Sequence, residues 1–437
     1  MAGYFIYSPY EKSGIWVSSG VNKFRQFLSF ATGHQTKALG VVIPSGTSGS
    51  FAVTGIGFQP DALLVFTDGS NFDAGAVDDM AISIGCATSS SDRWTGGIES
   101  KFGDITTRQC WWLDDALLYA RGDDAQFEID LTSFDADGFT LDIVTAPDQD
   151  IRIMGLALKH PSGTNFASGT ELSPAANGTQ SITCGFEPNV VLVAHTQAEA
   201  LRAFTPGFAR IGTGSFDFTN GQWQIWTGGS GVTSDPYIDQ VATSGKALSM
   251  WIDADGAGPF DPTLIAEASI STTATGFDLN WSTTDGTQRY FSWLAIASDV
   301  ESNRWTYNSS LGTQRVFTRK GPQGLFFYAN DMGVNALGGS PGQGGDHNTE
   351  TFSMGIGYGM CDFDLTQGVF DTGATDAHIF AFAELGSRYG DLGSAFGSVA
   401  RGTPGGLPPL APGPSDHGTI IRISTKRDHL LRMHCGQ

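Results

Sequence analysis

Adjacent aspartates are the first residues in this chain whose types and spacing could do chemistry, and they occur as Asp78-Asp79, Asp114-Asp115 and Asp123-Asp124. Two carboxylates on either side of a glycosidic bond are the usual machinery of glycoside hydrolysis. That reaction depends on the distance between the carboxylates across a cleft, and adjacency in sequence does not set this distance. Because the chain has 45 acidic residues, a solvated surface is the simpler interpretation of these pairs.

Two other motifs match only parts of known sites. The segment Gly338-Gly339-Ser340-Pro341-Gly342 has the spacing of a nucleophile elbow, but glycine-rich sequence stands where that elbow needs a strand and a helix. The segments Asp135-Ala136-Asp137-Gly138 and Asp253-Ala254-Asp255-Gly256 begin like calcium loops and lack the Glu at the twelfth position. The eight histidines show no metal-binding spacing. We therefore predict no catalytic residues, no metal and no cofactor, and a protein that is not an enzyme.

Aromatic residues are the stronger candidates for contacts. Exposed tryptophans surrounded by Gly and Ser can stack on sugars or anchor a protein interface. Trp94 and Trp226 occupy matching positions in a repeat described below, which favours a place in the core for both. Trp111, Trp112 and Trp223 stay open as interface or glycan contacts.

Charge and composition exclude several classes of partner. The formal net charge of −21 argues against nucleic acid, whose binding needs Lys and Arg on the phosphates. No apolar run approaches the roughly 20 residues that span a bilayer, and the first residues do not read as a secretory signal. The five cysteines show no disulfide or metal spacing. We expect synthesis in a cytoplasm, no membrane insertion, and mostly buried thiols.

An internal repeat organises the chain. Gly57-Phe58-Gln59-Pro60 leads into the apolar run 62–67, and Gly185-Phe186-Glu187-Pro188 leads into the run 190–195, 128 residues later. Each copy continues with a Trp-Thr-Gly-Gly segment, a turn before a Gly-Phe pair, and an apolar closing strand. Such recurrence identifies each unit as one folding module.

The modules read as sheets. Apolar residues alternate with polar ones at Phe127, Ile129 and Leu131, the pattern of a strand with one solvated face. With 58 Gly and 16% charged residues, the composition favours short strands and tight turns. The predicted fold is all-β, with tandem β-sandwich (jelly-roll-like) modules and an irregular C-terminal region.

The predicted domain boundaries follow the repeat. We expect an aromatic N-terminal arm over 1–37, module one over 38–160, module two over 164–299, a degenerate third β module over 300–400, and a Pro-rich linker with a basic tail over 401–437. The arm either fills the core of module one or lies on a neighbouring subunit. In the tail, Arg422, Lys426 and Arg427 either fold back onto the acidic body or contact an acidic neighbour.

Module one carries a family resemblance. The segments 57–66, 84–94 (Ile-Gly-Cys-Ala-Thr-Ser-Ser-Ser-Asp-Arg-Trp) and 133–141 (Ser-Phe-Asp-Ala-Asp-Gly-Phe-Thr-Leu) resemble modules found in structural proteins of tailed bacteriophages, especially those of aquatic bacteria. Module two resembles them loosely, and residues 300–437 hardly at all. The resemblance implies β-sandwich units in tail, fibre or head-surface proteins, and it implies no catalytic residues.

Together these observations predict a virion structural protein that assembles as a symmetric homo-oligomer, in the tail or adsorption apparatus. The expected partners are copies of itself and other virion proteins. Alternatives within the virion are head-surface (capsid) decoration and a tail fibre. From another class, the alternative is a receptor-binding protein for a host surface glycan, or a polysaccharide depolymerase.

Overall fold

The computed structural model describes the backbone of residues 4–5, 16–17, 22–31, 34–67, 69, 80–101, 104–121, 126–160, 165–206, 208–230, 237–252, 262–297, 300–308, 313–314, 322–333, 355–362, 367–373, 422–426 and 430–434. Every regular element in these ranges is a β-strand, which confirms the predicted all-β class. No helix in these ranges has the length and apolar character needed to cross a bilayer.

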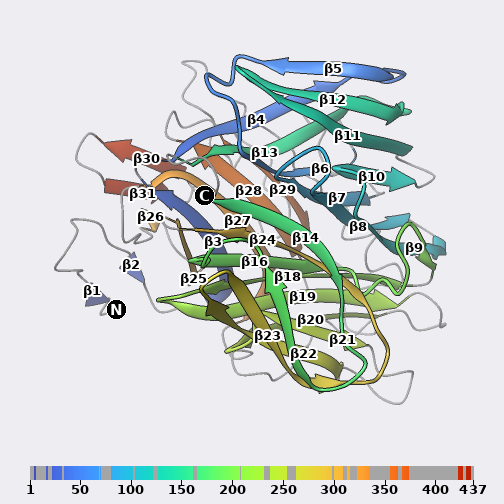
Figure 1. The fold of residues 1–437 in the computed structure, drawn as a ribbon, viewed down its shortest axis with the longest axis vertical. Coiled ribbons are helices and arrows are strands. Elements are labelled where there is room, and N and C mark those ends of the chain that lie inside the picture. The colour runs from blue at the N-terminus through green and yellow to red at the C-terminus, as the bar shows by residue number, and fades with distance from the viewer. Residues whose placement is uncertain are drawn as a thin grey trace.

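Module one consists of ten strands drawn in blue to teal in Figure 1. They are β4 (Gln35–Ile43), β5 (Gly49–Thr54), β6 (Ala62–Thr67), β7 (Met80–Ala87), β8 (Arg93–Lys101), β9 (Asp104–Leu113), β10 (Leu118–Arg121), β11 (Gln126–Asp135), β12 (Gly138–Thr145) and β13 (Ile151–Lys159).

Module two also has ten strands, and a two-residue strand, β17 (Thr205–Pro206), lies among them. The ten are β14 (Phe166–Leu172), β15 (Gly178–Thr183), β16 (Val190–His195), β18 (Phe208–Asp217), β19 (Gly221–Ser230), β20 (Tyr237–Ser244), β21 (Leu248–Ile252), β22 (Thr263–Thr273), β23 (Gly276–Thr284) and β24 (Tyr290–Ile296).

The two modules have the same sheet topology. The small sheet of module one has the order β10-β11-β12-β5, and that of module two has the order β21-β22-β23-β15. The large sheets run β9-β8-β7-β6-β13-β4 and β20-β19-β18-β16-β24-β14. In each module an apolar cluster joins residues of the small and large sheets, as in a sandwich. The duplication expected from the sequence is therefore present in the strand order.

The central strands β6 and β16 of the large sheets are buried on both faces. In β6, Leu63 and Val65 belong to the cluster inside module one, whereas Leu64 and Phe66 belong to a second cluster shared with module two. A strand buried on both faces needs a continuous apolar run, which is why residues 62–67 do not alternate. The small sheet keeps one solvated face, and β11 alternates as predicted.

The Gly-Phe-x-Pro turn has the same backbone in both modules. Gly57 has φ of +88° and Gly185 has φ of +86°, in the left-handed region that favours glycine. Gly57 N donates a hydrogen bond of 2.6 Å to the Asp137 carboxylate, and Gly185 N donates one of 3.0 Å to the Thr275 carbonyl. The Asp137 side chain, in the β11–β12 connection, therefore holds the turn of module one.

Strand registers correct one detail of the repeat. Leu64 and Leu192 each pair with a leucine of the closing strand, which makes them equivalent. Leu64 pairs with Cys86 of β7, which pairs with Trp94 of β8. In the same way Leu192 pairs with Ser215 of β18, which pairs with Trp223 of β19, so Trp94 and Trp223 are equivalent. The predicted match of Trp94 with Trp226 is wrong, although both are core residues as predicted, at 0% and 1% exposure.

The N-terminal segment joins strands from beyond residue 299. The strand β3 (Asn22–Ala31) lies between β25 (Val300–Asn308) and β27 (Pro322–Gly333), and the sheet continues through β28 (Gly355–Asp362) and β29 (Gln367–Gly373). Phe30, Phe326 and Tyr328 enter the core shared by the two modules. This part of the predicted arm thus packs within its own chain. A third repeat over 300–400 stays a prediction.

Four short pairings complete the described strands. β1 (Tyr4–Phe5) pairs with β2 (Trp16–Val17), and β17 pairs with β9. β31 (Leu430–His434) pairs with both β26 (Thr313–Gln314) and β30 (Arg422–Lys426). β30 lies within the predicted basic tail. The Pro-rich linker lies outside the described residues.

Candidate functional site

The contact between the two large sheets is the most elaborate feature of the described residues. Trp94 and Trp112 of module one stack with ring centroids 5.6 Å apart and an interplanar angle of 18°. Both indole N–H groups donate to module two: Trp94 to the Trp293 carbonyl at 3.1 Å, and Trp112 to the Ser292 hydroxyl at 2.8 Å. Buried indoles usually find such partners, and here the partners fix one module against the other.

Glycines on the neighbouring strand make room for the tryptophans of β9. Gly96 pairs with Trp112, and Gly97 pairs with Trp111. A Cβ atom on Gly96 would lie 1.9 Å from the Trp112 ring, and one on Gly97 would lie 2.5 Å from the Trp111 ring. Each indole therefore lies against the bare backbone of β8, and both rings are fully buried.

A segment of module two, which we call the strap (residues 196–206), crosses onto module one. Its Thr196 hydroxyl donates to the Trp111 carbonyl at 2.9 Å, and its Arg202 N donates to the Trp112 carbonyl at 2.9 Å. At its end, β17 pairs with β9 and extends the large sheet of module one by a strand. The strap thus supplies edge pairing between modules.

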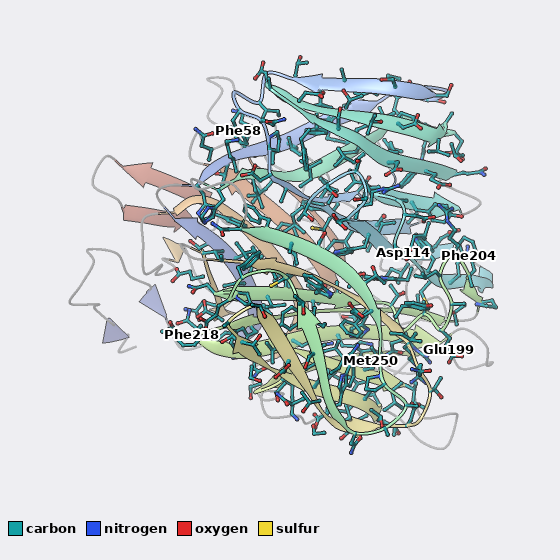
Figure 2. The ribbon with its side chains drawn as sticks, viewed as in Figure 1. Phe58, Asp114, Glu199, Phe204, Phe218 and Met250 are labelled. Atoms are coloured by element: carbon teal, nitrogen blue, oxygen red, sulfur yellow. The ribbon has the colours of Figure 1, made fainter. Side chains whose placement is uncertain are left out.

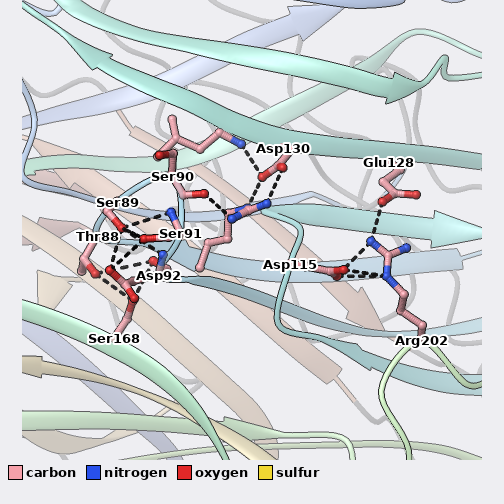
Figure 3. Close-up of polar contacts among 12 residues, drawn as sticks. Thr88, Ser89, Ser90, Ser91, Asp92, Asp115, Glu128, Asp130, Ser168 and Arg202 are labelled. Carbon is pink, nitrogen blue, oxygen red and sulfur yellow. Dashed lines mark hydrogen bonds and ion pairs between the residues drawn. The ribbon is translucent and has the colours of Figure 1, made fainter. Parts of the chain in front are cut away.

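Two strap side chains strengthen this contact. Phe204, labelled in Figure 2, packs at centroid distances of 5.8 Å from Trp111 and 6.0 Å from Tyr119. The Arg202 guanidinium donates to Asp115 and to Glu128, each at 2.9 Å (Figure 3). These two carboxylates raise the pKa of Arg202 further above its ordinary value.

The corresponding end of module two is closed by its own residues. There Trp226 occupies the position of Gly97, by strand register, and packs with Val241 and Trp251. Module one instead receives Phe204 from the strap. This asymmetry makes the core of module one dependent on module two.

The dependence predicts a loss of stability on Phe204→Ala. Removing a half-buried phenylalanine from the Trp111 ring should lower the free energy of unfolding by about 2 kcal/mol. Phe218→Ala is the matched control, because Phe218 is 64% exposed, and its change should stay within about 0.5 kcal/mol. Urea unfolding followed by tryptophan fluorescence measures both. Equal changes in the two variants would show that the strap does not support module one.

A buried polar cluster fills the neighbouring end of the module two sandwich. The Gln224 side-chain oxygen accepts from Ser249 N, and the Gln224 side-chain nitrogen lies 2.9 Å from His195 Nε2. All three residues are at most 1% exposed. Burial lowers the pKa of His195 to about 3, hydrogen bonding to the Ser249 carbonyl opposes this shift, and the nearby Arg289 charge adds to it. The imidazole is therefore neutral and structural.

In module one, hydroxyl groups take the place of the Gln224 amide as hydrogen-bond partners. There the Tyr119 N–H of β10 donates to the Ser83 hydroxyl at 3.2 Å, and Ser83 contacts Thr95 at 3.0 Å. By strand register, Tyr119 corresponds to Ser249 and Thr95 to Gln224. In both modules a side chain of the large sheet satisfies a backbone N–H of the facing edge strand, which burial would otherwise leave unpaired.

The serine-rich turn between β7 and β8 is held from both sides (Figure 3). The Ser89 hydroxyl donates to the Asp92 carboxylate at 2.7 Å, and Ser168 of module two donates to the Asp92 carbonyl at 3.0 Å. The Arg93 guanidinium pairs with the Asp130 carboxylate on the small sheet. This turn belongs to the segments that carry the family resemblance, and its contacts are structural.

The predicted contact residues need correction. Trp111 and Trp112 are 0% exposed and Trp223 is 7% exposed, so no ring face is available to a sugar or to another subunit. Their surroundings are supplied by the chain itself. Arg422 and Lys426 lie on β30, but their side chains and all of Arg427 lie outside the described residues.

The predicted carboxylate and loop motifs are placed only in part. Asp115 pairs with Arg202, and Asp135 accepts hydrogen bonds from Thr140 and Ser133, which lower its pKa. Within the described ranges no three His, Cys, Asp or Glu side chains are grouped as metal ligands. The pairs at 78–79 and 123–124, the loop 253–256 and the segment 338–342 lie outside the described residues.

Comparison with known proteins adds no relative to this description. No protein-family model, no curated protein and no solved structure matches the chain.

Proposed function

We propose that this chain is a structural protein of a tailed-bacteriophage virion, assembled as a symmetric multimer in the tail or adsorption apparatus. The observation that carries the proposal is the joining of two like sandwiches through one shared apolar core and the strap. A protein made of repeated sheets that pack on one another is suited to form a rigid building block. The resemblance of module one to phage structural modules supports the same assignment.

The charge of the chain fits such a role. A net charge of −21 keeps free copies soluble and suits docking onto a basic surface of another virion protein. Head-surface decoration and a fibre are the alternative locations. Glycan binding loses its supporting residues, because the three tryptophans on which it rested are buried. No contact among the described residues favours a depolymerase.

The test is the protein content of purified particles. Particles released from cells that make this protein should contain it in many copies, at a constant ratio to the major head protein, measured by quantitative mass spectrometry. Gold-labelled antibodies against the chain should then mark the tail or the head surface in electron micrographs. Recovery of the chain only from the soluble cell fraction, as a free monomer, would overturn the assignment.

A further inference from the structure

Each small sheet ends in an edge strand that no described strand covers. These strands are β5 in module one and β15 in module two, and each is paired on one side only, with β12 and β23 respectively. Both show the same order of exposed and buried residues along their six positions. In Figure 1, β5 forms the outer margin of module one.

Exposed sheet edges pair readily with other strands, and natural proteins block them with charges, prolines or bulges. The other outer strands of the two modules have such features: Lys37 in β4, Arg121 in β10, Glu171 in β14, Pro206 in β17, Asp239 in β20, and a register shift in β21. Neither β5 nor β15 has a charge, a proline or a register shift. These two edges are unprotected where the others are protected.

We propose that β5 is an assembly edge, which pairs antiparallel with β5 of a second copy of this chain. The inference rests on the proposed function, since it names the surface through which the multimer forms. Residues directly opposite each other in an antiparallel pair point to the same face of the sheet. A two-fold axis at Ala52 satisfies this rule: it places Ala52 against Ala52, Ser50 against Thr54, and Phe51 against Val53.

The chemistry of β5 suits a copy of itself. Because every copy carries a charge of −21, two copies repel one another, and a contact between them requires a surface without charge. All six residues of β5 are uncharged. The buried Val53 and the partly buried Phe51 belong to the module one cluster, so the pairing would extend that apolar row across the joint.

The corresponding strand of module two is less suited. Gln180 stands at the position of Phe51, and its amide donates to the Leu172 carbonyl of β14 at 3.2 Å. Ser181 stands at the position of Ala52. The apolar row that β5 offers is therefore interrupted in β15, and we assign the self-contact to β5.

The experiment uses the full chain and three lysine variants, with mass measured by light scattering after size-exclusion chromatography. Ala52→Lys places two like charges opposite each other at the axis and should weaken self-association about a hundredfold or more. Val144→Lys adds the same charge at a 54% exposed site on the neighbouring strand, and should leave association unchanged. Ser181→Lys tests the edge of module two, and should also leave it unchanged.

A cysteine variant tests the register. Ala52→Cys should form a disulfide-linked dimer on oxidation, above the background of the wild-type cysteines, whereas Val144→Cys should not. A monomeric wild-type protein, dissociation by Ser181→Lys in place of Ala52→Lys, or absence of the Ala52→Cys dimer would each overturn the proposal. Particle incorporation is measured separately, so an Ala52→Lys chain that still enters particles would refute the β5 contact and leave the proposed function intact.

Discussion

Replacing Gly85 with alanine is expected to prevent folding of module one. A Cβ atom on Gly85 would lie 1.7 Å from the Leu117 carbonyl oxygen and 2.9 Å from the Leu117 carbonyl carbon. Both are backbone atoms, which cannot turn away as a side chain can. Separating β7 from the segment that leads into β10 would open the sandwich, and we expect a loss of more than about 4 kcal/mol.

Module two offers an independent test of the same contact. Gly214 is the register equivalent of Gly85, and a Cβ atom there would lie 2.0 Å from the Ala247 carbonyl oxygen. Gly46→Ala is the control: Gly46 has φ of +74° and open space around it, so alanine should cost only about 1 kcal/mol of backbone strain. Soluble yield and urea unfolding of the Gly85→Ala, Gly214→Ala and Gly46→Ala proteins measure the difference in stability. A Gly85→Ala protein as stable as Gly46→Ala would contradict the close approach of the two sheets.

The second large effect is a loss of stability in acid caused by His195. Its pKa of about 3 in the folded protein lies below the ordinary value of 6.5, because burial disfavours the charged imidazole. The unfolded chain therefore binds a proton that the folded chain does not, between these two values. The titration of His195 therefore leaves the free energy of unfolding unchanged above about pH 6.5 and lowers it as the pH decreases toward 3. At about pH 4.5 the loss from this residue should be about 3 kcal/mol.

Comparison of the wild type with His195→Gln isolates this contribution. Other acidic groups titrate in the same range in both proteins, so only the difference between their pH profiles reports on His195. The free energy of unfolding, measured in urea at about pH 7.5 and about pH 4.5, should fall further in the wild type by about 3 kcal/mol. Parallel profiles would mean that the imidazole is not buried as described, since solvation would restore its ordinary pKa.

Much of the fold could be predicted from local sequence. The Gly-Phe-x-Pro turn requires a glycine with positive φ, and this requirement appears in the sequence at both Gly57 and Gly185. The apolar run 62–67 signals a strand buried on both faces, and the alternation in β11 signals a solvated face. These features depend on residues close in sequence, so their pattern is readable without knowledge of contacts.

The positions of the tryptophans depend on register, which local sequence does not give. By strand register Trp94 is equivalent to Trp223, an offset of 129 residues that Cys86 and Ser215 on the preceding strands share. The similarity of Trp94-Thr95-Gly96-Gly97 to Trp226-Thr227-Gly228-Gly229 suggests instead an offset of 132 residues, three more than the strand register gives. A slip of three residues moves a side chain to the opposite face of a sheet. Trp94 accordingly faces module two, whereas Trp226 faces the interior of its own module.

The burial of Trp111 and Trp112 has a similar cause. The flanking sequence mixes apolar Cys110 and Leu113 with polar Gln109 and Asp114, and does not by itself mark the two rings as core. The rings are enclosed by Gly96 and Gly97 on the paired strand and by residues of module two, more than 80 positions away. A candidate signal was available in the Gly-Gly pair opposite a Trp-Trp pair, but it requires the β8–β9 register to be known.

The central claim is that the two modules are one cooperative unit because they share a core. Pulsed hydrogen exchange with mass spectrometry, on the full chain across a urea series, tests it most directly. Peptides covering β6 and β16 should lose protection at the same urea concentration, with the same midpoint and slope. Loss of protection in β16 while β6 remains fully protected, or the reverse, would show two independent domains and contradict the account.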